Sequence, residues 1–498
     1  MIQRRNYAEE RLAEERARVA MQAARARRLR WTVAAAGLVV VAGTAAALLS
    51  SANFGLGNAL RATMAGAAKL LPQTSQPLVD LPPLPPRPPR PASGPEAYRT
   101  GQLDPKVQQI PPEIQQLSGG PALPYVQAVA RFLTQGEADE FLKVKRLHDW
   151  VAATIAYDVD GLRGRSPRMT GLDEVLRSRR AVCQGYAAVF EALCKSAGIE
   201  ARIIGGMGRS APGDAWLTAL GPDQAHAWNA VRIQGAWHLL DVTWDAGSTN
   251  DDVFEWGYTT DYLFLPPEAF LYTHLPDDPA DQLVAQPITQ VQFLARPFLR
   301  GEFYSAGLTL ATPVEQVTGA SSVEIRHCED VRVWAELTDQ GGKTRIKGQT
   351  LVAMAPGGVV VQVRPVLAPA TLTISAGPSA GGPAAEVAEI RVAAGTAPPT
   401  PLAQVSSTLS RLRGQLAEPL DERLPTDKPV PFRVREPKVD GVSVESGGKW
   451  TPLARDGTSQ VFAGEVILVA GPVRLYAHEK PDDPNWTVLA EYTASADP

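Results

Sequence analysis

The dipeptide Gln234-Gly235 separates two runs in which apolar and polar residues alternate, HAWNAVRI before it and AWHLLD after it. Alternation with a period of two predicts two β-strands. A glycine between them is typical of a tight hairpin turn, because glycine adopts positive φ at no steric cost. A two-residue turn fixes the register, since Ile233 must then face Ala236.

This register predicts one histidine–carboxylate pair. Counting back from the turn, Trp228 faces Asp241 and His226 faces Thr243. Because side chains alternate between the two faces of a sheet, these four side chains point to one face and His238 to the other. His226 and Asp241 are then diagonal neighbours, within reach of a hydrogen bond.

A helix is predicted over residues 182–197, where apolar side chains recur at three- and four-residue steps, with Gly198 as its left-handed stop. Cys183 falls in its first turn, where the partial positive charge of the helix end favours the thiolate and lowers the thiol pKa from about 8.5. Cys194 lies on the buried stripe and is predicted to be a core residue.

A cysteine, a histidine and a carboxylate are the parts of an activated nucleophile with its base and its orienting group. Cys183, His226 and Asp241 are therefore the candidate catalytic residues. Metal binding is the competing use of these residue types, but spacings of 43 and 15 residues do not suit a structural zinc site. We expect no metal and no other cofactor.

Three segments resemble the transglutaminase-like (papain-like) cysteine superfamily. The lead-in helix of the family is similar to FLKVKRLHDWVAATIAYD, and its nucleophile helix is similar to VCQGYAAVFEALCKSAGIEAR. Its histidine and aspartate strands are similar to HAWNAVRIQGAWHLLDVTWDAG. The later segment DYLFLPPEAFLYTHLPDDPADQLV is similar to the kyphoscoliosis peptidase group, which often has a tryptophan where this chain has Asp281. The resemblance covers about residues 98–285. It implies an α+β core in which Cys183 is the nucleophile, His226 the base and Asp241 the orienting residue.

Other residues are expected around this triad. The backbone N–H of Cys183 is the first candidate donor to an oxyanion, with Gln184 or Tyr157 beside it. Trp228 and Trp244 are expected to frame the site.

Three further polar residues are expected to have no catalytic role. Asp245 is expected to frame the site with its neighbouring tryptophan. His148 is interpreted as a surface or helix-packing residue and His274 as a structural residue of a packed loop.

The amino-terminal part predicts a membrane anchor. Residues 1–30 carry nine Arg against four Glu, and residues 31–50 are uncharged and long enough to span a bilayer as a helix. A cleaved signal peptide is the alternative, although the charged region before its apolar segment is normally shorter. Positive charge beside the span predicts a cytoplasmic tail in a single-pass inner membrane protein, with the remaining chain extracytoplasmic or periplasmic. Residues 51–95, which include LPPLPPRPPRP, are expected to form a Pro-rich spacer.

The carboxy-terminal third predicts two small all-β modules. Short alternating runs separated by glycines indicate a β-sandwich over residues 286–396, beginning with the run VQFLARPF. A linker over 397–430 and a second β module over 431–498 follow. An envelope partner is the expected ligand of these modules. The net charge of −4 gives no sign of nucleic-acid binding.

Together these features predict a transglutaminase-like catalytic domain over residues 96–285, anchored in the membrane and acting outside the cytoplasm. Its substrate is a protein or peptide, and its reaction is cleavage or transfer of an amide bond through a cysteine thiolate. The alternatives are a transglutaminase that cross-links proteins, and a non-catalytic envelope or cell-division scaffold with the same fold.

Overall fold

The computed structural model describes residues 78, 83–250, 252–395, 401–411, 413–436, 438–457, 460–480 and 485–496. The expected cytoplasmic tail and membrane span, residues 1–50, lie outside this set. Within the described set, every helix is too short or too polar to cross a bilayer.

The first domain has an α+β fold, as expected. Its helices are α3 (Pro112–Gln116), α4 (Ala122–Thr134), α5 (Glu140–Thr154), α6 (Val159–Leu162), α7 (Leu172–Ser178), α8 (Cys183–Ser196), α9 (Val242–Ala246) and α10 (Pro267–Phe270). Its strands are β1 (Ala156–Tyr157), β2 (Arg180–Ala181), β3 (Ala201–Gly208), β4 (Ala225–Ile233), β5 (Ala236–Leu240), β6 (Gly247–Asn250), β7 (Val253–Trp256) and β8 (His274–Pro276).

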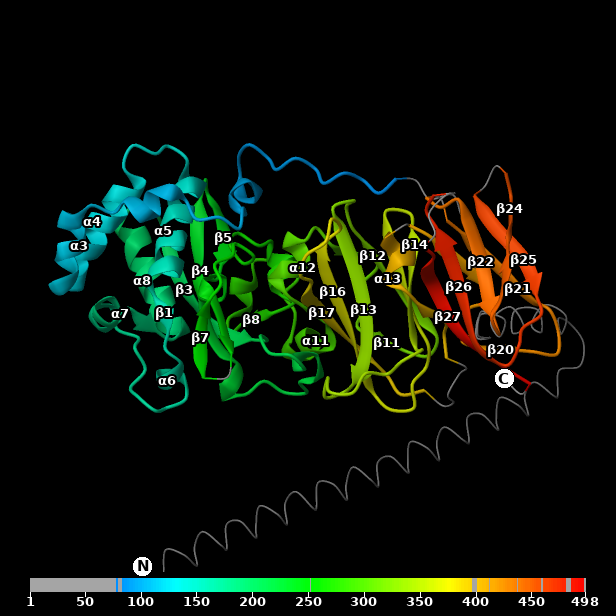
Figure 1. Ribbon diagram of the computed structural model, residues 1–498. Coiled ribbons are helices and arrows are strands. Elements are labelled where there is room, and N and C mark those ends of the chain that lie inside the picture. The colour runs from blue at the N-terminus through cyan, green and yellow to red at the C-terminus, as the bar shows by residue number, and fades with distance from the viewer. Residues whose placement is uncertain are drawn as a thin grey trace, which may run out of the picture. The chain divides into compact units, whose positions relative to one another are not determined.

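Four of these strands form an antiparallel sheet in the order β5-β4-β3-β8. Helices α4, α5 and α8 pack together on one side of it (Figure 1), and their apolar stripes share one core with Val231 and Ile233 of β4. The other face of the sheet, with Ile204 and Trp228, is covered by Phe270 of α10 and the loop before it. The sheet thus separates two apolar cores.

The hairpin has the expected register near its turn. Ile233 pairs with Ala236 and Asn229 with Leu240, and positive φ angles of 52° at Gln234 and 84° at Gly235 close a two-residue turn. Beyond Leu240 the prediction was wrong, because β5 ends there and helix α9 begins.

Asp241 causes this change. Its side chain accepts hydrogen bonds from the backbone N–H groups of Thr243 and Trp244, and so caps α9. Neither the pairing of Trp228 with Asp241 nor that of His226 with Thr243 is formed. The His226–Asp241 contact comes instead from the cap that places Asp241 at the end of the strand.

The next module is a β-sandwich. One sheet has the order β10-β12-β15-β14 and the other β11-β17-β16-β13 with β9 beside β17. Its elements are α11 (Gln290–Ala295), β9 (Phe298–Leu299), α12 (Gly301–Ser305), β10 (Thr309–Leu310), β11 (Gln316–Val317), β12 (Ser321–Arg326), β13 (Val331–Asp339), β14 (Thr350–Ala355), β15 (Gly358–Val363), β16 (Ala370–Pro378) and β17 (Ala385–Val392). The run VQFLARPF begins as helix α11 rather than as a strand, since Thr289 caps it in a capping box.

The last module is a second β-sandwich, with sheets β18-β27-β26-β22-β23 and β19-β21-β25-β24, and β20 paired with β27. Its elements are β18 (Gln404–Val405), α13 (Ser407–Arg411), β19 (Gln415–Glu418), β20 (Arg423–Pro425), β21 (Val430–Arg435), β22 (Gly441–Ser446), β23 (Lys449–Pro452), β24 (Ala454–Arg455), β25 (Val461–Val466), β26 (Gly471–His478) and β27 (Thr487–Ser495). Most of the expected linker belongs to this module, because Leu402, Leu416 and Leu424 are buried in its core.

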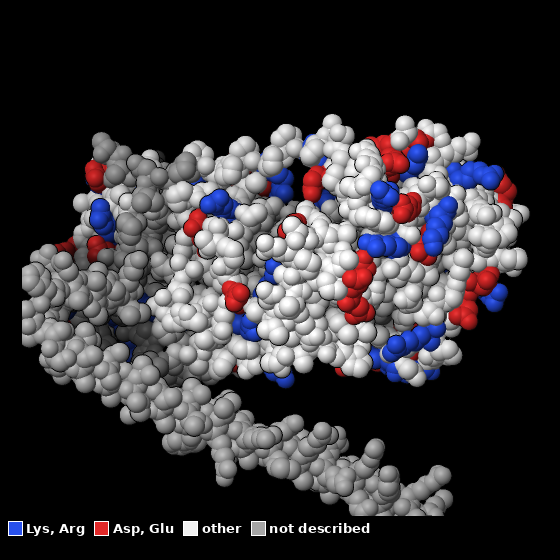
Figure 2. All heavy atoms as spheres, turned by 180° about the vertical axis from the view of Figure 1, so that it is seen from behind, with Lys and Arg blue, Asp and Glu red and all other residues white. Residues whose placement is uncertain are grey.

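Part of the expected Pro-rich spacer also packs on folded structure. Leu84 is buried in the core of the first sandwich, and Arg87 forms a 2.6 Å ion pair with Asp330. Residues 83–91 therefore follow the surface of that module and do not form a free spacer. Over the face shown in Figure 2, acidic and basic side chains lie interspersed, in keeping with the nearly balanced charge.

Candidate active site

Cys183 is the first residue of α8, after Val182 at the N-cap. Its half-buried thiol is free. Cys194, three turns along the same helix, is fully buried, and burial raises the pKa of its thiol well above the usual value. The two cysteines therefore occupy the contrasting positions that the helix pattern predicts.

The surroundings of Cys183 favour its thiolate. Burial alone would raise the thiol pKa, but the interaction with the His226 imidazole outweighs it and lowers the pKa. A backbone hydrogen bond from Ala227 acts in the same direction. Since Ala227 follows His226 on β4, the strand that carries the histidine also stabilises the sulfur.

His226 and Asp241 form a close hydrogen-bonded pair. Nε2 of His226 lies 2.7 Å from Oδ2 of Asp241, and both side chains are almost wholly shielded from solvent. Burial opposes a charged imidazole, yet the Asp241 carboxylate raises the pKa of His226 to about 10. The ionised carboxylate only accepts hydrogen bonds, so it fixes the proton on Nε2 and leaves Nδ1 for the thiol.

Asp241 is held from both of its oxygens. Burial would raise its pKa, but His226 and a second histidine, His274, hold the pKa well below the usual range. Oδ1 accepts from the backbone of α9, whereas Oδ2 accepts from the two imidazoles. The carboxylate is thus fixed in orientation as well as ionised.

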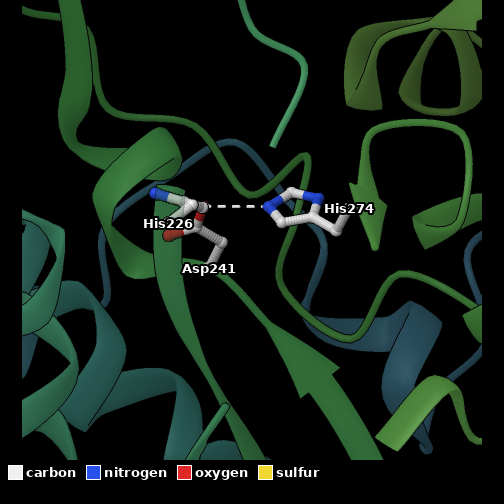
Figure 3. Close-up of side chains that lie close together, drawn as sticks. All are labelled: His226, Asp241 and His274. Atoms are coloured by element: carbon white, nitrogen blue, oxygen red, sulfur yellow. Dashed lines mark hydrogen bonds and ion pairs between the residues drawn. The ribbon is translucent and has the colours of Figure 1, made fainter. Parts of the chain in front are cut away.

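His274 was not predicted to belong to the site. It begins strand β8, is fully buried, and places Nε2 3.2 Å from Oδ2 of Asp241 (Figure 3). The sequence of its segment predicted a packed loop. The segment instead forms a strand that pairs with β3, where His274 faces Gly208. The alternation of β3 and β4 carries no information on this third strand, so sequence pattern alone could not bring His274 to Asp241.

His226, Asp241 and His274 each offer one potential metal ligand, and the three atoms lie within 4.8 Å of one another. Two imidazoles and a carboxylate suit zinc chemically. Both Nε2 atoms, however, donate protons to the same carboxylate oxygen, so a cation would have to replace both hydrogen bonds. The geometry fits a hydrogen-bonded cluster better than a metal centre.

The framing residues take different positions. Trp244 stacks on the His226 ring at a centroid distance of 4.8 Å, whereas Trp228 is buried beneath it at 5.9 Å. Burial raises the pKa of Tyr157, and the nearby Cys183 acts in the same direction. Gln184 is exposed in the first turn of α8.

A cavity of about 380 Å³ opens beside His226. This volume lies within the range of about 300–1,000 Å³ that is usual for ligand pockets. Its lining includes Tyr157, Trp244 and Tyr262, and also Arg300 and Glu302 from beyond the expected end of the domain at residue 285. Between these two residues, the backbone N–H of Gly301 donates a hydrogen bond of 3.0 Å to the Tyr262 hydroxyl, which holds this segment at the cavity.

Asp245 does not frame the cavity as expected. Its Oδ2 lies 3.1 Å from Nε2 of His148, whose Nδ1 lies 3.1 Å from Asp149. Burial disfavours a charged His148, but the two carboxylates raise its pKa, and Lys145 also pairs with Asp149. This buried network joins α5 to α9, and His148 is accordingly a packing residue and not a surface one.

The profile of the transglutaminase-like superfamily matches residues 127–242, which contain all three triad residues. Residues 127–242 form a transglutaminase-like domain.

Curated relatives match mainly this domain. Human kyphoscoliosis peptidase is 29% identical over 204 residues, which are 39% of this chain and 30% of that protein. Drosophila melanogaster hillarin is 29% identical over 191 residues, 35% of this chain and 23% of hillarin. Cytokinesis protein 3 of Schizosaccharomyces pombe is 20% identical over 234 residues, 46% of this chain and 25% of that protein. This chain thus spans less than a third of the length of each of these relatives.

Proposed function

We propose that the transglutaminase-like domain is a cysteine enzyme that cleaves or transfers amide bonds of proteins or peptides. The observation that carries this proposal is the 2.7 Å contact between His226 and Asp241 beside a cysteine whose thiol pKa is lowered at the start of α8. Acyl transfer through a thioester requires a thiolate, a base that can give up and take up a proton, and a carboxylate that holds this base in place.

The chemistry proceeds in two steps. The Cys183 sulfur bonds to the amide carbonyl carbon, and the backbone N–H of Cys183 is the proposed donor to the resulting oxyanion. The amide C–N bond then breaks, and the departing amine takes the proton that His226 carries on Nδ1. In the second step His226 removes a proton from the acceptor, the acceptor attacks the thioester, and the thiolate leaves. Asp241 stays ionised and stabilises the imidazolium throughout.

The acceptor decides the class of reaction. Water yields a carboxylic acid and makes the protein a peptidase, whereas a lysine amine yields a new amide and makes it a cross-linking transglutaminase. We favour the peptidase because the kyphoscoliosis peptidase is among the similar proteins. The triad serves both reactions equally well.

We further propose that the domain acts outside the cytoplasm, tethered by residues 31–50, with the two β-sandwiches binding an envelope partner. The uncharged span and the arginines before it support the tether. A non-catalytic envelope or cell-division scaffold is the second candidate. The complete set of Cys183, His226 and Asp241, with the last two in a 2.7 Å contact, argues against it, since binding alone does not need a nucleophile with its base.

Incubation of the full-length protein with a library of peptides, with and without an amine donor, tests the reaction. Mass spectrometry distinguishes hydrolysis from a product that carries the amine. Cys183→Ala should abolish both products, whereas Cys194→Ala is the matched control and should retain them. Products that survive in Cys183→Ala, or an absence of products from the whole library with the unaltered protein, would contradict the proposal.

A further inference from the structure

His274 lies on the far side of Asp241 from the catalytic histidine. Strand β8 pairs with β3 at the edge of the sheet, which places His274 opposite Gly208. At Gly208 a β-carbon would lie only 3.0 Å from the Trp244 ring and 3.4 Å from Cβ of His226. Glycine thus allows β3 to approach both site residues closely, and β8 pairs with β3 at this point.

The hydrogen bonds of His274 define its tautomer. Its Nε2 lies 3.2 Å from Oδ2 of Asp241, and its Nδ1 lies 2.9 Å from the hydroxyl of Thr273. An ionised carboxylate can only accept, so Nε2 carries the proton and Nδ1 is left as the acceptor that faces the Thr273 hydroxyl, which also lies 3.3 Å from the Phe270 carbonyl oxygen. Asp241 therefore receives two imidazole N–H groups on one oxygen.

The surroundings keep His274 neutral. Its ring packs against Phe270 and Trp244 at centroid distances of 4.1 and 4.2 Å. The charged groups that act on it are Asp241, His226 and Asp245. Burial outweighs the two carboxylates and lowers its pKa to about 4, so His274 does not become a second cation that would compete with the His226 imidazolium.

We propose that His274 is a positioning residue that, as a neutral donor, holds Oδ2 of Asp241 in line with Nε2 of His226. The backbone of α9 fixes the other oxygen, so the carboxylate cannot rotate about its bond to Cβ. The fixed carboxylate orients the His226 ring so that Nδ1 faces Cys183. This inference rests on the proposed function of the triad.

Three variants of the protein distinguish the role of the His274 N–H group from that of the His274 ring. His274→Phe keeps an aromatic ring and removes the donor, whereas His274→Gln keeps an amide N–H near the position of Nε2. Thr273→Val removes the hydroxyl that lies 2.9 Å from Nδ1 and leaves the histidine in place. His238→Phe is the matched control, because His238 lies on the other face of the sheet against Phe141 and Phe264.

The main readout is the rate of Cys183 alkylation by iodoacetamide as a function of pH, which needs no substrate. The sites of modification are resolved by peptide mapping, so that Cys328, a second half-buried free cysteine, is scored separately. We expect His274→Phe to move the midpoint upward, toward the ordinary thiol value of about 8.5. His274→Gln and His238→Phe should keep the midpoint of the unaltered protein, and Thr273→Val should lie between.

A peptide substrate adds a second readout. His274→Phe should lower kcat about 10- to 100-fold, the loss typical of removing a group that orients a reactive side chain, with KM nearly unchanged. His274→Gln should recover most of the rate. A structural role for the ring alone predicts the opposite order, with His274→Gln more damaging than His274→Phe.

The outcomes are distinguishable. Equal alkylation midpoints in His274→Phe and the unaltered protein would overturn the positioning role and leave the triad intact. Equal losses in His274→Phe and His274→Gln would also overturn it, because restoring an N–H donor would then make no difference. A midpoint near 8.5 in the unaltered protein would overturn both the positioning role and the proposed function. If His274→Phe does not fold, the midpoints of His274→Gln and Thr273→Val are compared instead. A higher midpoint in Thr273→Val supports the positioning role, and equal midpoints overturn it.

Discussion

Oδ1 of Asp241 accepts a hydrogen bond of 2.8 Å from the backbone N–H of Thr243, and this bond connects the chemistry of the site to its folding. The same carboxylate that faces His226 ends strand β5 and begins helix α9. A substitution at Asp241 therefore affects both the orientation of the base and the local backbone.

Asp241→Asn should separate these two roles. An asparagine still caps a helix, so the free energy of unfolding should change by less than about 1 kcal/mol. The neutral amide no longer stabilises the imidazolium, and we expect kcat to fall by about 10²- to 10⁴-fold. Steady-state kinetics and denaturant unfolding on the same preparation check this. A large loss of stability with little change in kcat would refute it.

His274 should make stability depend on pH in mildly acidic solution. Its pKa of about 4 in the folded protein lies below the unfolded value of about 6.5, so the unfolded chain binds the proton first. The stability that accompanies neutral His274 is complete above pH 6.5 and is lost as the pH falls toward 4, by up to about 3 kcal/mol. In His274→Phe the loss between these pH values should be smaller by this amount. Urea unfolding at pH 7 and pH 4.5 measures this loss. An equal drop in the free energy of unfolding in the unaltered protein and in His274→Phe would count against the assignment.

The buried network around His148 should be a large contributor to stability. Removal of the imidazole in His148→Phe leaves Asp149 and Asp245 buried without their shared cation, which typically costs about 3–5 kcal/mol. Thermal and denaturant unfolding measure the loss. The matched control is again His238→Phe, which should cost less than about 1 kcal/mol because His238 is only half-buried. Similar costs for the two variants would show that the network is not stabilising.

Trp244 should govern substrate binding as well as the base. Its ring stacks on His226 and lines the cavity, so Trp244→Ala removes a wall of the cavity and a support of the imidazole. We expect KM to rise about tenfold and kcat to fall, whereas Trp244→Phe should preserve most of both. Kinetics that are unchanged in Trp244→Ala would place the substrate elsewhere.

Local patterns predicted the parts of the site that short-range geometry controls. Helical periodicity predicted Cys183 in the first turn of α8, and the two-residue turn predicted the register of the hairpin as far as Leu240. The change from strand to helix at Asp241 was missed, since a capping aspartate after an alternating run resembles one more strand residue. His274, Arg300 and Glu302 reach the site through β8 and α12, whose packing depends on contacts distant in sequence.

In the β modules too, local patterns did not predict packing that depends on contacts distant in sequence. Alternation predicted their strands, but residues 401–430 resembled a linker because their short strands are interrupted by Pro, Ser and Thr. Burial of Leu416 and Leu424 in the shared core, which no local pattern reveals, makes this segment part of the second sandwich.

The central claim is that Cys183 is an activated nucleophile, and its alkylation rate as a function of pH in the unaltered protein and in Asp241→Asn tests this most directly. We predict a midpoint well below 8.5 for Cys183 in the unaltered protein and a shift back toward 8.5 in Asp241→Asn, because the imidazolium loses its carboxylate. A midpoint near 8.5 that is the same in both proteins would contradict the account.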